Sequence, residues 1–404
     1  MSRELLKGIR VIDFTDFLAG PYCTMIMGDM GAEVIKIENL RGGGNFTRNA
    51  KPIEEKTGRS MYWGNLNRNK KDIALDLKSE GGKKLFAELV KSADVLVENN
   101  RPGVMAKLGF SYEACKELNP SLIYASISGY GQSGPNSYKP GYDIIAQAQG
   151  GCMSVTGLVD GEPLRAGVAI GDMFAALNVA TAVCASLFER KTSGLGNYID
   201  VSLVDSVFSA MEAKMMTYVY TGKSPKATGS RYLTSAPYDC YKAGDDFFVI
   251  ASGTDKHFVL LSGAIGMPEL AEDPRFCNTE MRNRNWKELK DIINEWASHM
   301  TAKEAVAAID AVGVPAAEIY NCEKAANDPA IAVDREMLVK VPAHKDHPES
   351  GDLTVIGSPI KMKEAPVQYK SAAPDFGEHN YEIFSALGFS DEELEAFKAE
   401  GVIN

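Results

Sequence analysis

The sequence predicts an α/β protein with an open parallel sheet in a large domain and a second, smaller α+β domain. Three observations carry this prediction. In about the first 200 residues, short apolar runs alternate with helical patterns, as in consecutive β-α-β units. From Gly222 onward, proline and glycine punctuate a stretch with two strands followed by amphipathic helices. The length of 404 residues allows two or three domains with a large core.

The first β-α-β unit opens the chain. Residues 8–14 predict a buried strand, Ala19-Gly-Pro21 begins a helix that ends near Gly31, and residues 32–37 form the next strand. This order predicts parallel strands with right-handed crossovers. The first turn, residues 13–20, lacks the G-x-G-x-x-G spacing of a dinucleotide site, which disfavours a nicotinamide or flavin dehydrogenase.

The same alternation continues toward residue 220. Further strands are predicted at residues 72–76, 93–98, 122–127 and 197–202, and helices from Ser79 to about Lys91, from Ser111, and from Asp205 to Tyr220. A glycine-rich loop at residues 128–134 follows one of these strands. Open α/β sheets bind ligands at such loops, so we expect a site there.

The second domain and the C-terminal part follow. The predicted strands are residues 236–241, 246–251 and 353–356, and the predicted helices are residues 256–265, 286–298 and 301–312, with a helical tail from Tyr381. We expect the tail to return to the first domain.

Composition and charge restrict the partners. A net charge of -11 disfavours nucleic acid and anionic membranes, which both attract broad positive potential. The longest apolar run, residues 173–188, is short for a bilayer and contains Asn178, Thr181 and Ser186, so it predicts a core helix. Residues 1–8 contain no apolar signal region. We therefore expect a cytoplasmic protein with no nucleic-acid and no membrane partner.

Cysteine and histidine spacing gives no signature of a disulfide or a metal. The 7 cysteines are scattered, with no C-x-x-C pair, and predict reduced core residues. Only His344 and His347 form a close pair, and their spacing would suit a metal. Because Pro342, Lys345 and Pro348 surround them, we predict a solvated loop and no metal site.

Asp172 is the candidate catalytic residue. It ends a small apolar run, and no Lys or Arg lies between Arg165 and Arg190 to pair with it. The Ala-rich segment that follows has the composition of a helix buried on all sides. The amide groups and the dipole at a helix start would keep Asp172 ionised, and therefore nucleophilic. The alternative is that Asp172 is simply an N-cap.

A series of short motifs runs along nearly the whole chain. It comprises residues 6–14 (LKGIRVIDF), 19–21 (AGP), 31–38 (GAEVIKIE), 67–78 (NRNKKDIALDLK), 93–99 (ADVLVEN), 128–135 (SGYGQSGP), 141–151 (GYDIIAQAQGG), 357–359 (GSP) and 377–379 (GEH). In this order and spacing the motifs resemble the class III CoA-transferase family, which includes formyl-CoA and carnitine-type CoA-transferases.

The resemblance implies an architecture. A large Rossmann-like α/β domain would consist of residues 1–205 and 340–404, and a small α+β domain of residues 225–325. Residues 206–224 and 326–339 would link the two domains. Two chains would interlock in a homodimer.

The resemblance also implies a mechanism. Asp172 aligns with the family's nucleophilic aspartate, whose carboxylate attacks an acyl-CoA thioester to give a mixed anhydride and then an aspartyl-CoA thioester. The expected partners are therefore an acyl-CoA and a second carboxylic acid. Coenzyme A takes part as a substrate, and no cofactor is expected to be bound permanently.

For CoA, the resemblance implies a pocket made from several loops. The positions carried over are Phe17, Leu18, Ala19, Leu75, Lys78, Asn99, Asn100 and Lys107, with Tyr142 and Asp143 lining the active site. Basic side chains there would suit the 3′-phosphate and the diphosphate of CoA. Each lysine has an alternative role as a solvated surface charge, and Tyr142 and Asp143 have one as an ordinary helix start.

Three departures from the formyl-CoA transferase pattern bear on the substrate. Leu18 replaces a glutamine, Asn39 replaces an arginine, and residues 226–232 (KATGSRY) replace a tetraglycine flap. These differences argue against oxalate and formate, and the apolar Leu18 favours a larger or less polar acyl group.

Two other functions remain open. α-Methylacyl-CoA racemases resemble this chain, but where they have Gly-His-Asp this chain has Gly141-Tyr142-Asp143, and a tyrosine with an ordinary pKa near 10 is a poor base at neutral pH. A non-catalytic CoA-binding scaffold is the third candidate.

Overall fold

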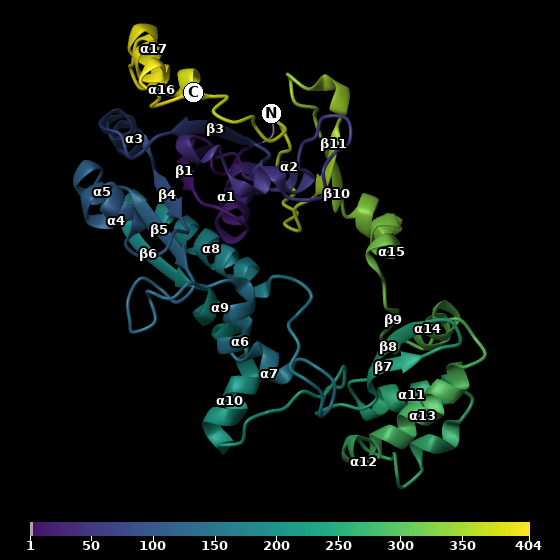
Figure 1. The fold of residues 1–404 in the computed structure, drawn as a ribbon. Coiled ribbons are helices and arrows are strands. Elements are labelled where there is room, and N and C mark those ends of the chain that lie inside the picture. Colours follow the sequence, from purple (N-terminus) through teal and green to yellow (C-terminus); the bar gives the residue numbers. More distant parts are fainter. Residues whose placement is uncertain (1–2) are drawn as a thin grey trace. The chain divides into compact units, whose positions relative to one another are not determined.

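The computed structural model describes residues 3–404, which divide into two compact units (Figure 1). The large unit contains residues 3–152, 165–221 and 329–404, and the small unit contains residues 153–164 and 222–328. The sequence analysis had assigned residues 153–164 to the large domain. They belong to the small unit, where the backbone N–H of Gly229 donates to the carbonyl of Gly157 at 3.0 Å.

A six-stranded parallel sheet forms the centre of the large unit, in the order β3-β2-β1-β4-β5-β6. The strands are β1 (Arg10–Phe14), β2 (Glu33–Asn39), β3 (Lys70–Leu75), β4 (Val95–Glu98), β5 (Ile123–Ser128) and β6 (Asn197–Ser202), and all neighbours pair in parallel. This is the strand order of a doubly wound Rossmann-type sheet, and it confirms the predicted fold class. From β1 the chain adds β2 and β3 on one side of the sheet, and then β4, β5 and β6 on the other side. The topological switch point of the sheet therefore lies between β1 and β4.

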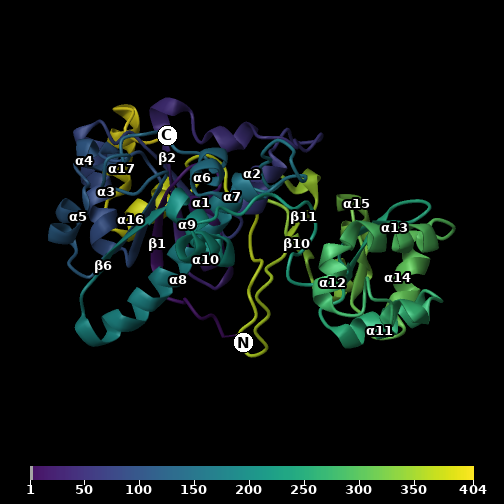
Figure 2. The same cartoon turned by 90° about the horizontal axis from the view of Figure 1, so that it is seen from below.

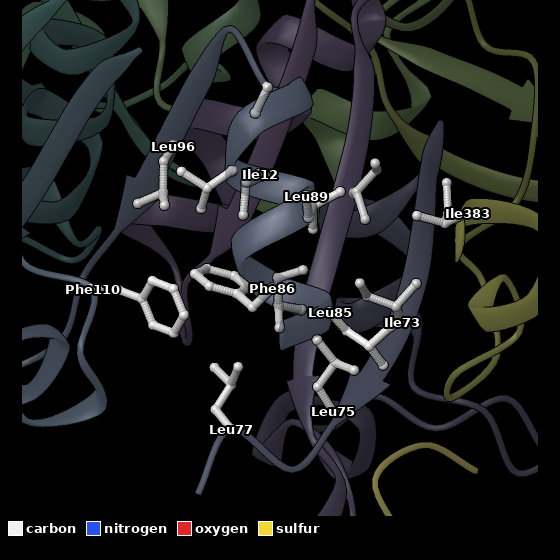
Figure 3. Close-up of a cluster of buried hydrophobic side chains, with 14 of the residues drawn as sticks. Ile12, Ile73, Leu75, Leu77, Leu85, Phe86, Leu89, Leu96, Phe110 and Ile383 are labelled. Atoms are coloured by element: carbon white, nitrogen blue, oxygen red, sulfur yellow. The ribbon is translucent and has the colours of Figure 1, made fainter. Parts of the chain in front are cut away.

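Alternate residues of each strand face opposite sides of the sheet, so the sheet is buried on both faces. Ile12 of β1 belongs to the core shown in Figure 3, together with Phe86 and Leu89 of α3 (Glu80–Ser92). Its neighbour Val11 belongs to the core on the other face, together with Val179 and Val183 of α8 (Ile170–Ser193). Continuous apolar strands were therefore the correct signal for a sheet covered by helices on both sides.

Helices of the large unit begin mostly where the sequence places capping residues. They are α1 (Ala19–Asp29), α2 (Met61–Asn67), α3 (Glu80–Ser92), α4 (Val104–Leu108), α5 (Tyr112–Leu118), α6 (Asp143–Gln149), α8 (Ile170–Ser193), α9 (Leu203–Ala210), α10 (Glu212–Thr221), α16 (Asn380–Ala386) and α17 (Asp391–Ala399), with α7 (Cys152–Val155) at the junction of the two units. The side chains of Ser79 and Ser111 accept from the backbone N–H groups of Gly82 and Ala114, as their predicted capping roles require. The predicted helix 205–220 is two helices, because Glu212 has a left-handed φ of 41°.

Helix α8 corrects two predictions. Its N-cap is Ala169, so Asp172 is the third helical residue and not the cap. The helix is also not buried on all sides, since Leu177 and Phe188 are 43% and 77% exposed. Among the described residues 3–404, α8 is the one helix long and apolar enough to cross a membrane by length and composition, although the sequence analysis judged its apolar run too short.

The C-terminal segment completes the large unit. Strands β10 (Leu338–Val341) and β11 (Leu353–Ile356) form an antiparallel pair, and α16 and α17 lie beside α3 (Figure 2). The N–H of Asp76 donates to the carbonyl of Val402 at 2.9 Å, and the N–H of Ala74 donates to Asn380 Oδ1 at 3.0 Å. The tail therefore returns to the first domain, as expected.

The small unit has its own antiparallel sheet in the order β7-β8-β9. Its elements are β7 (Tyr238–Lys242), β8 (Phe247–Ala251), β9 (Ala316–Glu318), α11 (Asp255–Ala264), α12 (Thr279–Arg284), α13 (Trp286–Ala297), α14 (Ala302–Asp310) and α15 (Cys322–Asn327). Phe248 and Ile293 are among the buried residues of a separate core. The three-residue strand β9 was missed because it has no alternating pattern of its own.

Candidate active site

The candidate site lies at the carboxyl ends of the strands, beside the topological switch point between β1 and β4, where open α/β sheets bind ligands. The loops that follow β1, β4 and β5 and the starts of α6 and α8 line a cavity of about 610 Å³. Of the site residues predicted from the sequence, eight line this cavity: Phe17, Leu18, Ala19, Asn99, Asn100, Tyr142, Asp143 and Asp172.

Asp172 faces this cavity from the first turn of α8. Within residues 3–404, no ion pair or hydrogen bond involves its carboxylate. Burial, and after it the negative charge of Asp143, raises the pKa of Asp172 to about 6. The side chain is therefore mostly ionised at neutral pH, yet poorly solvated and without a compensating cation. These are the properties of a reactive carboxylate.

Asp143 holds the start of α8. Its Oδ1 accepts from the backbone N–H of Gly171 at 2.8 Å, and its Oδ2 accepts from Nε2 of Gln147 at 2.7 Å. Asp143 thus satisfies one of the free amide groups at the first turn of α8, the task that the sequence analysis considered for Asp172. It lines the cavity as predicted, but both of its oxygens already have protein partners.

The turn after β1 forms another wall. Phe17 has a left-handed φ of 62°, and its ring packs edge-on against Tyr142, with 6.2 Å between the ring centroids. Leu18 is the N-cap of α1 and Ala19 is its first residue. An aromatic and an aliphatic side chain therefore line the cavity where a glutamine would have offered hydrogen bonds.

A second cavity of about 420 Å³ adjoins the first, and both are lined by Asp16 and Asn100. Leu75 and Lys78 line this second cavity, as the resemblance implied. Lys107 lines neither cavity. It lies on the exposed side of α4, so its predicted place in the CoA pocket is not supported by the structure.

Three residues of the first cavity were missed by sequence reasoning: Tyr62, Arg101 and Lys139. Burial, and then the charge of Asp172, raises the pKa of Tyr62. Arg101 comes two residues after Asn99 at the end of β4, and its position after a parallel strand was the signal that could have identified it. Tyr62 carried no such signal, because α2 reaches the site only through tertiary packing.

Two glycines of the first cavity pack backbone against backbone. A Cβ on Gly129 would lie 2.5 Å from Cα of Gly141, and a Cβ on Gly141 would lie 2.3 Å from Cα of Gly129. Neither position has room for a side chain. This contact holds the loop after β5 against the segment that leads to Tyr142.

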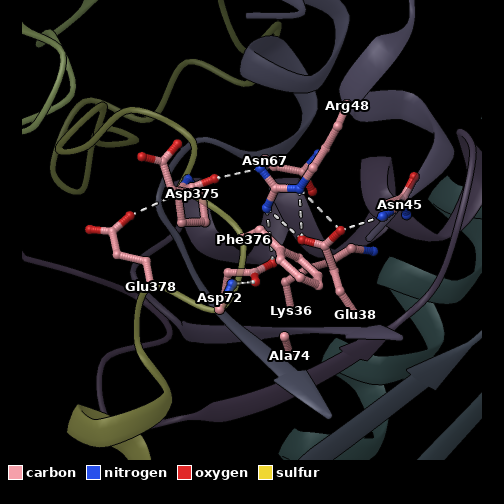
Figure 4. A network of polar contacts seen from close by, with 12 residues as sticks. Lys36, Glu38, Asn45, Arg48, Asn67, Asp72, Ala74, Asp375, Phe376 and Glu378 are labelled. Atoms are coloured by element: carbon pink, nitrogen blue, oxygen red, sulfur yellow. Dashed lines mark hydrogen bonds and ion pairs between the residues drawn. The ribbon is translucent and has the colours of Figure 1, made fainter. Parts of the chain in front are cut away.

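Glu38 and Asn45, which line the second cavity, belong to a buried polar network (Figure 4). Nε of Arg48 donates to Glu38 Oε1 at 2.9 Å, and Nη2 of Arg48 lies 3.4 Å from Asp72 Oδ2. The N–H of Gly377 donates to Asp72 Oδ1 at 2.7 Å. Burial, and then hydrogen bonding to Glu38, raises the pKa of Asp72 well above its usual range.

The histidine pair does not lie in a solvated loop, which corrects that prediction. His344 is 7% exposed and its Nε2 lies 2.8 Å from Glu378 Oε2, while Nε2 of His347 lies 2.9 Å from Asp375 Oδ2. Their ring and carboxylate atoms are close enough to form a candidate metal-ligand group. However, Lys345 and Arg59 already pair with the two carboxylates, at 2.8 and 3.0 Å. The carboxylate charges are therefore balanced by protein cations.

The fold and the site together define a doubly wound α/β protein with a ligand-sized cavity at the carboxyl ends of its strands. Residues 6–380 match CoA-transferase family III, and the chain belongs to this family. It is therefore an enzyme of the class III CoA-transferase type.

Relatives and solved structures agree with this assignment. The chain is 40% identical over 356 residues to the acetyl-CoA:oxalate CoA-transferase of Acetobacter aceti, covering 88% of each protein. It is 36% identical over 400 residues to the succinyl-CoA--D-citramalate CoA-transferase of Chloroflexus aurantiacus, covering 98% of each. A crystal structure of a CaiB/BaiF family protein from Brucella suis superposes with a TM-score of 0.86 at 33% identity, covering 96% of this chain and 100% of that one.

Proposed function

We propose that this enzyme transfers CoA from an acyl-CoA thioester to a second carboxylic acid through covalent adducts on Asp172. The observation that carries the proposal is the state of this side chain: a carboxylate with a pKa near 6, facing a cavity of about 610 Å³, with no cation or donor bound to it among residues 3–404. A structural carboxylate at the same depth would normally be paired.

The chemistry proceeds without redox change. An oxygen of Asp172 attacks the thioester carbonyl, the C–S bond breaks, and a mixed anhydride and the CoA thiolate result. The thiolate then attacks the aspartyl carbonyl, which releases the first acid as its carboxylate and leaves an aspartyl-CoA thioester. The acceptor carboxylate attacks this thioester and expels the thiolate. Finally, the thiolate attacks the acyl carbonyl of the new anhydride, which frees Asp172 and gives the new acyl-CoA.

We propose that CoA extends through both cavities. The pantetheine arm would pass Asp16 and Asn100, which line both cavities, and end beside Asp172. Lys78 in the second cavity and Arg101 and Lys139 in the first supply positive charge for the phosphates. Arg101 and Lys139 take the role that the sequence analysis gave to Lys107.

For the acceptor we propose a dicarboxylic acid. Oxalate and D-citramalate, named in two relatives, are both dicarboxylic, and this chain covers those proteins almost completely. Leu18 and Phe17 make the wall near Asp172 apolar, which favours an acid with a carbon chain between its carboxyl groups over oxalate. Initial rates with acids of two to six carbons and one acyl-CoA donor would rank the acceptors.

We also propose the homodimer. Apolar side chains are exposed on α8 and α10 of the large unit, including Phe188 at 77% and Tyr220 at 80%. Exposed faces of this kind are commonly protein interfaces. Light scattering after size-exclusion chromatography would test it, with a mass of 87.6 kDa (2 × 43.8 kDa) expected. The cytoplasmic location and the absence of nucleic-acid and membrane partners stay predictions, which cell fractionation would test.

The decisive experiment looks for the covalent adducts. The enzyme is incubated with acyl-CoA, digested, and searched by mass spectrometry for acyl or CoA mass on the peptide containing Asp172, while exchange of CoA into a labelled acid is measured. Both signals should vanish in Asp172→Ala. Exchange that persists in this variant would contradict the proposal. Deuterium uptake at the α-carbon without exchange would indicate a racemase, and binding with neither reaction would indicate a scaffold.

A further inference from the structure

Asn99 connects the ends of β1 and β4, the two strands at the topological switch point of the sheet. It follows β4, and its side-chain Oδ1 accepts from the backbone N–H of Asp16, which follows β1, at 2.7 Å. Its Nδ2 donates to the backbone carbonyl of the same Asp16, also at 2.7 Å. Both ends of the amide are thus used on one peptide segment, so little of its hydrogen-bonding capacity is left for a ligand.

Asn100 differs from its neighbour. Its backbone N–H donates to Glu98 Oε2 at 2.8 Å, its side chain also hydrogen-bonds to the Glu98 carboxylate, and its Nδ2 contacts the sulfur of Met105 at 3.8 Å. The side chain of Asn100 lines both cavities. Within residues 3–404 its Oδ1 makes no hydrogen bond and is therefore available to a ligand, whereas both ends of the Asn99 amide are used.

The turn after β1, which Asn99 contacts, contains an unfavourable backbone conformation that other contacts must stabilise. Phe17 has a φ of 62°, a region that a phenylalanine adopts only when its surroundings impose it. Nζ of Lys36 donates to the carbonyl of Thr15, and Nδ2 of Asn45 donates to the carboxylate of Asp16. These two supports come from the β2 side of the turn, and Asn99 provides the support from the β4 side.

A chain of direct contacts connects this turn to the start of α8, where Asp172 lies. The ring of Phe17 packs against Tyr142, and Asp143, the next residue, accepts from the N–H of Gly171 beside Asp172. A shift of the turn would therefore displace one wall of the cavity that Asp172 faces.

We infer that Asn99 is a positioning residue that fixes the turn after β1, and that the ligand contact implied by the resemblance belongs to Asn100 alone. The inference rests on the proposed CoA transfer for its kinetic part only. Its structural part concerns the amide of Asp16 and needs no activity.

The test uses Asn99→Ala, Asn99→Asp and the matched Asn100→Ala in the full-length enzyme. Amide hydrogen exchange is followed in peptides covering residues 14–20, binding of free CoA by calorimetry, and kcat and KM by CoA exchange. Asn99→Ala should speed exchange at Asp16 by about tenfold or more, since it removes the acceptor of the Asp16 N–H. Asn99→Asp keeps the acceptor but loses the donor, and should lie between wild type and Asn99→Ala.

The two positions should separate kinetically. Asn99→Ala should lower kcat by about 10–100-fold through misplacement of the cavity wall, with the Kd of CoA changed by about twofold at most. Asn100→Ala should raise the Kd of CoA by about tenfold through a lost hydrogen bond, and leave exchange at residues 14–20 as in wild type.

Unchanged exchange in Asn99→Ala would overturn the inference, as would a loss of CoA affinity in Asn99→Ala equal to that in Asn100→Ala. Should Asn99→Ala not fold, the nearly isosteric Asn99→Asp carries the comparison. If CoA transfer fails in wild type, the proposed function is wrong, but the exchange and binding measurements still decide the role of Asn99.

Discussion

Asp143 and Gly171, 28 positions apart in the chain, are joined by a 2.8 Å hydrogen bond from the Gly171 N–H to the Asp143 carboxylate. This bond places a second negative charge at the start of α8, close enough to Asp172 to raise its pKa. Asp143→Asn keeps an acceptor for Gly171 but removes the charge. The acid limb of the pH–rate profile should therefore move to lower pH, while Asp310→Asn, an exposed carboxylate of the small unit, should leave the limb in place.

The wild-type pH profile provides a separate prediction. Only the ionised Asp172 is a nucleophile, and its pKa is about 6. kcat/KM should be half-maximal near pH 6 and about tenfold below its plateau at pH 5. Rates that stay flat down to pH 5 would show that another group limits the reaction.

Ionisation of Asp172 should also lower the free energy of unfolding. Its pKa rises from 3.8 in the unfolded chain to about 6 in the folded protein, so the folded state binds the proton more tightly, and stability falls as pH rises through this window. Asp172→Asn should raise the free energy of unfolding by about 1–3 kcal/mol at pH 7.5 and by little at pH 4. Urea unfolding at the two pH values measures the difference, and an equal effect at both would contradict it.

The basic residues of the first cavity can be separated from Lys107 by kinetics. Arg101→Gln and Lys139→Gln should each raise KM for acyl-CoA by about tenfold, because a charge-assisted contact with phosphate is lost. Lys107→Gln should leave KM unchanged, since this side chain lines neither cavity. A rise of KM in Lys107→Gln would restore the assignment made from sequence.

The buried network of Figure 4 should be sensitive to the loss of Arg48. Arg48→Met leaves Glu38 and Asp72 without their partner and should lower the free energy of unfolding by about 3–5 kcal/mol. Lys83→Ala removes only the exposed pair with Glu80 and should change it by less than about 0.5 kcal/mol. Chemical denaturation of both variants gives the comparison.

Much of the fold was predictable because local patterns coincide with the final packing. The buried strands, the serine caps and the glycine-rich turn after β5 were all predicted correctly from short windows of sequence. The capping of α8 was not predicted, because the acceptor for the Gly171 N–H is Asp143, a partner that no local pattern identifies. His344 read as solvated for the same reason: Glu378, 34 positions away, buries and pairs it.

The candidate site shows the same difference between residues that a local pattern identifies and residues that only tertiary packing brings together. Residues at the ends of strands could be placed from sequence, whereas Tyr62 enters the cavity on a helix with no catalytic motif. Lys107 lines neither cavity, and its charge alone could not show which side of a short helix faces them.

The return of the C-terminal segment to β3 has a consequence for synthesis. Backbone groups of Asp72 and Ala74 in β3, and of Asp76 just after it, are completed by His379, Asn380 and Val402, partners translated some three hundred residues later. Until translation is complete, the backbone N–H and C=O groups at this edge of the sheet have no partners. Such an edge is prone to aggregation and is the kind of surface that chaperones shield. Yield in the cell should therefore depend on how quickly the last thirty or so residues are released.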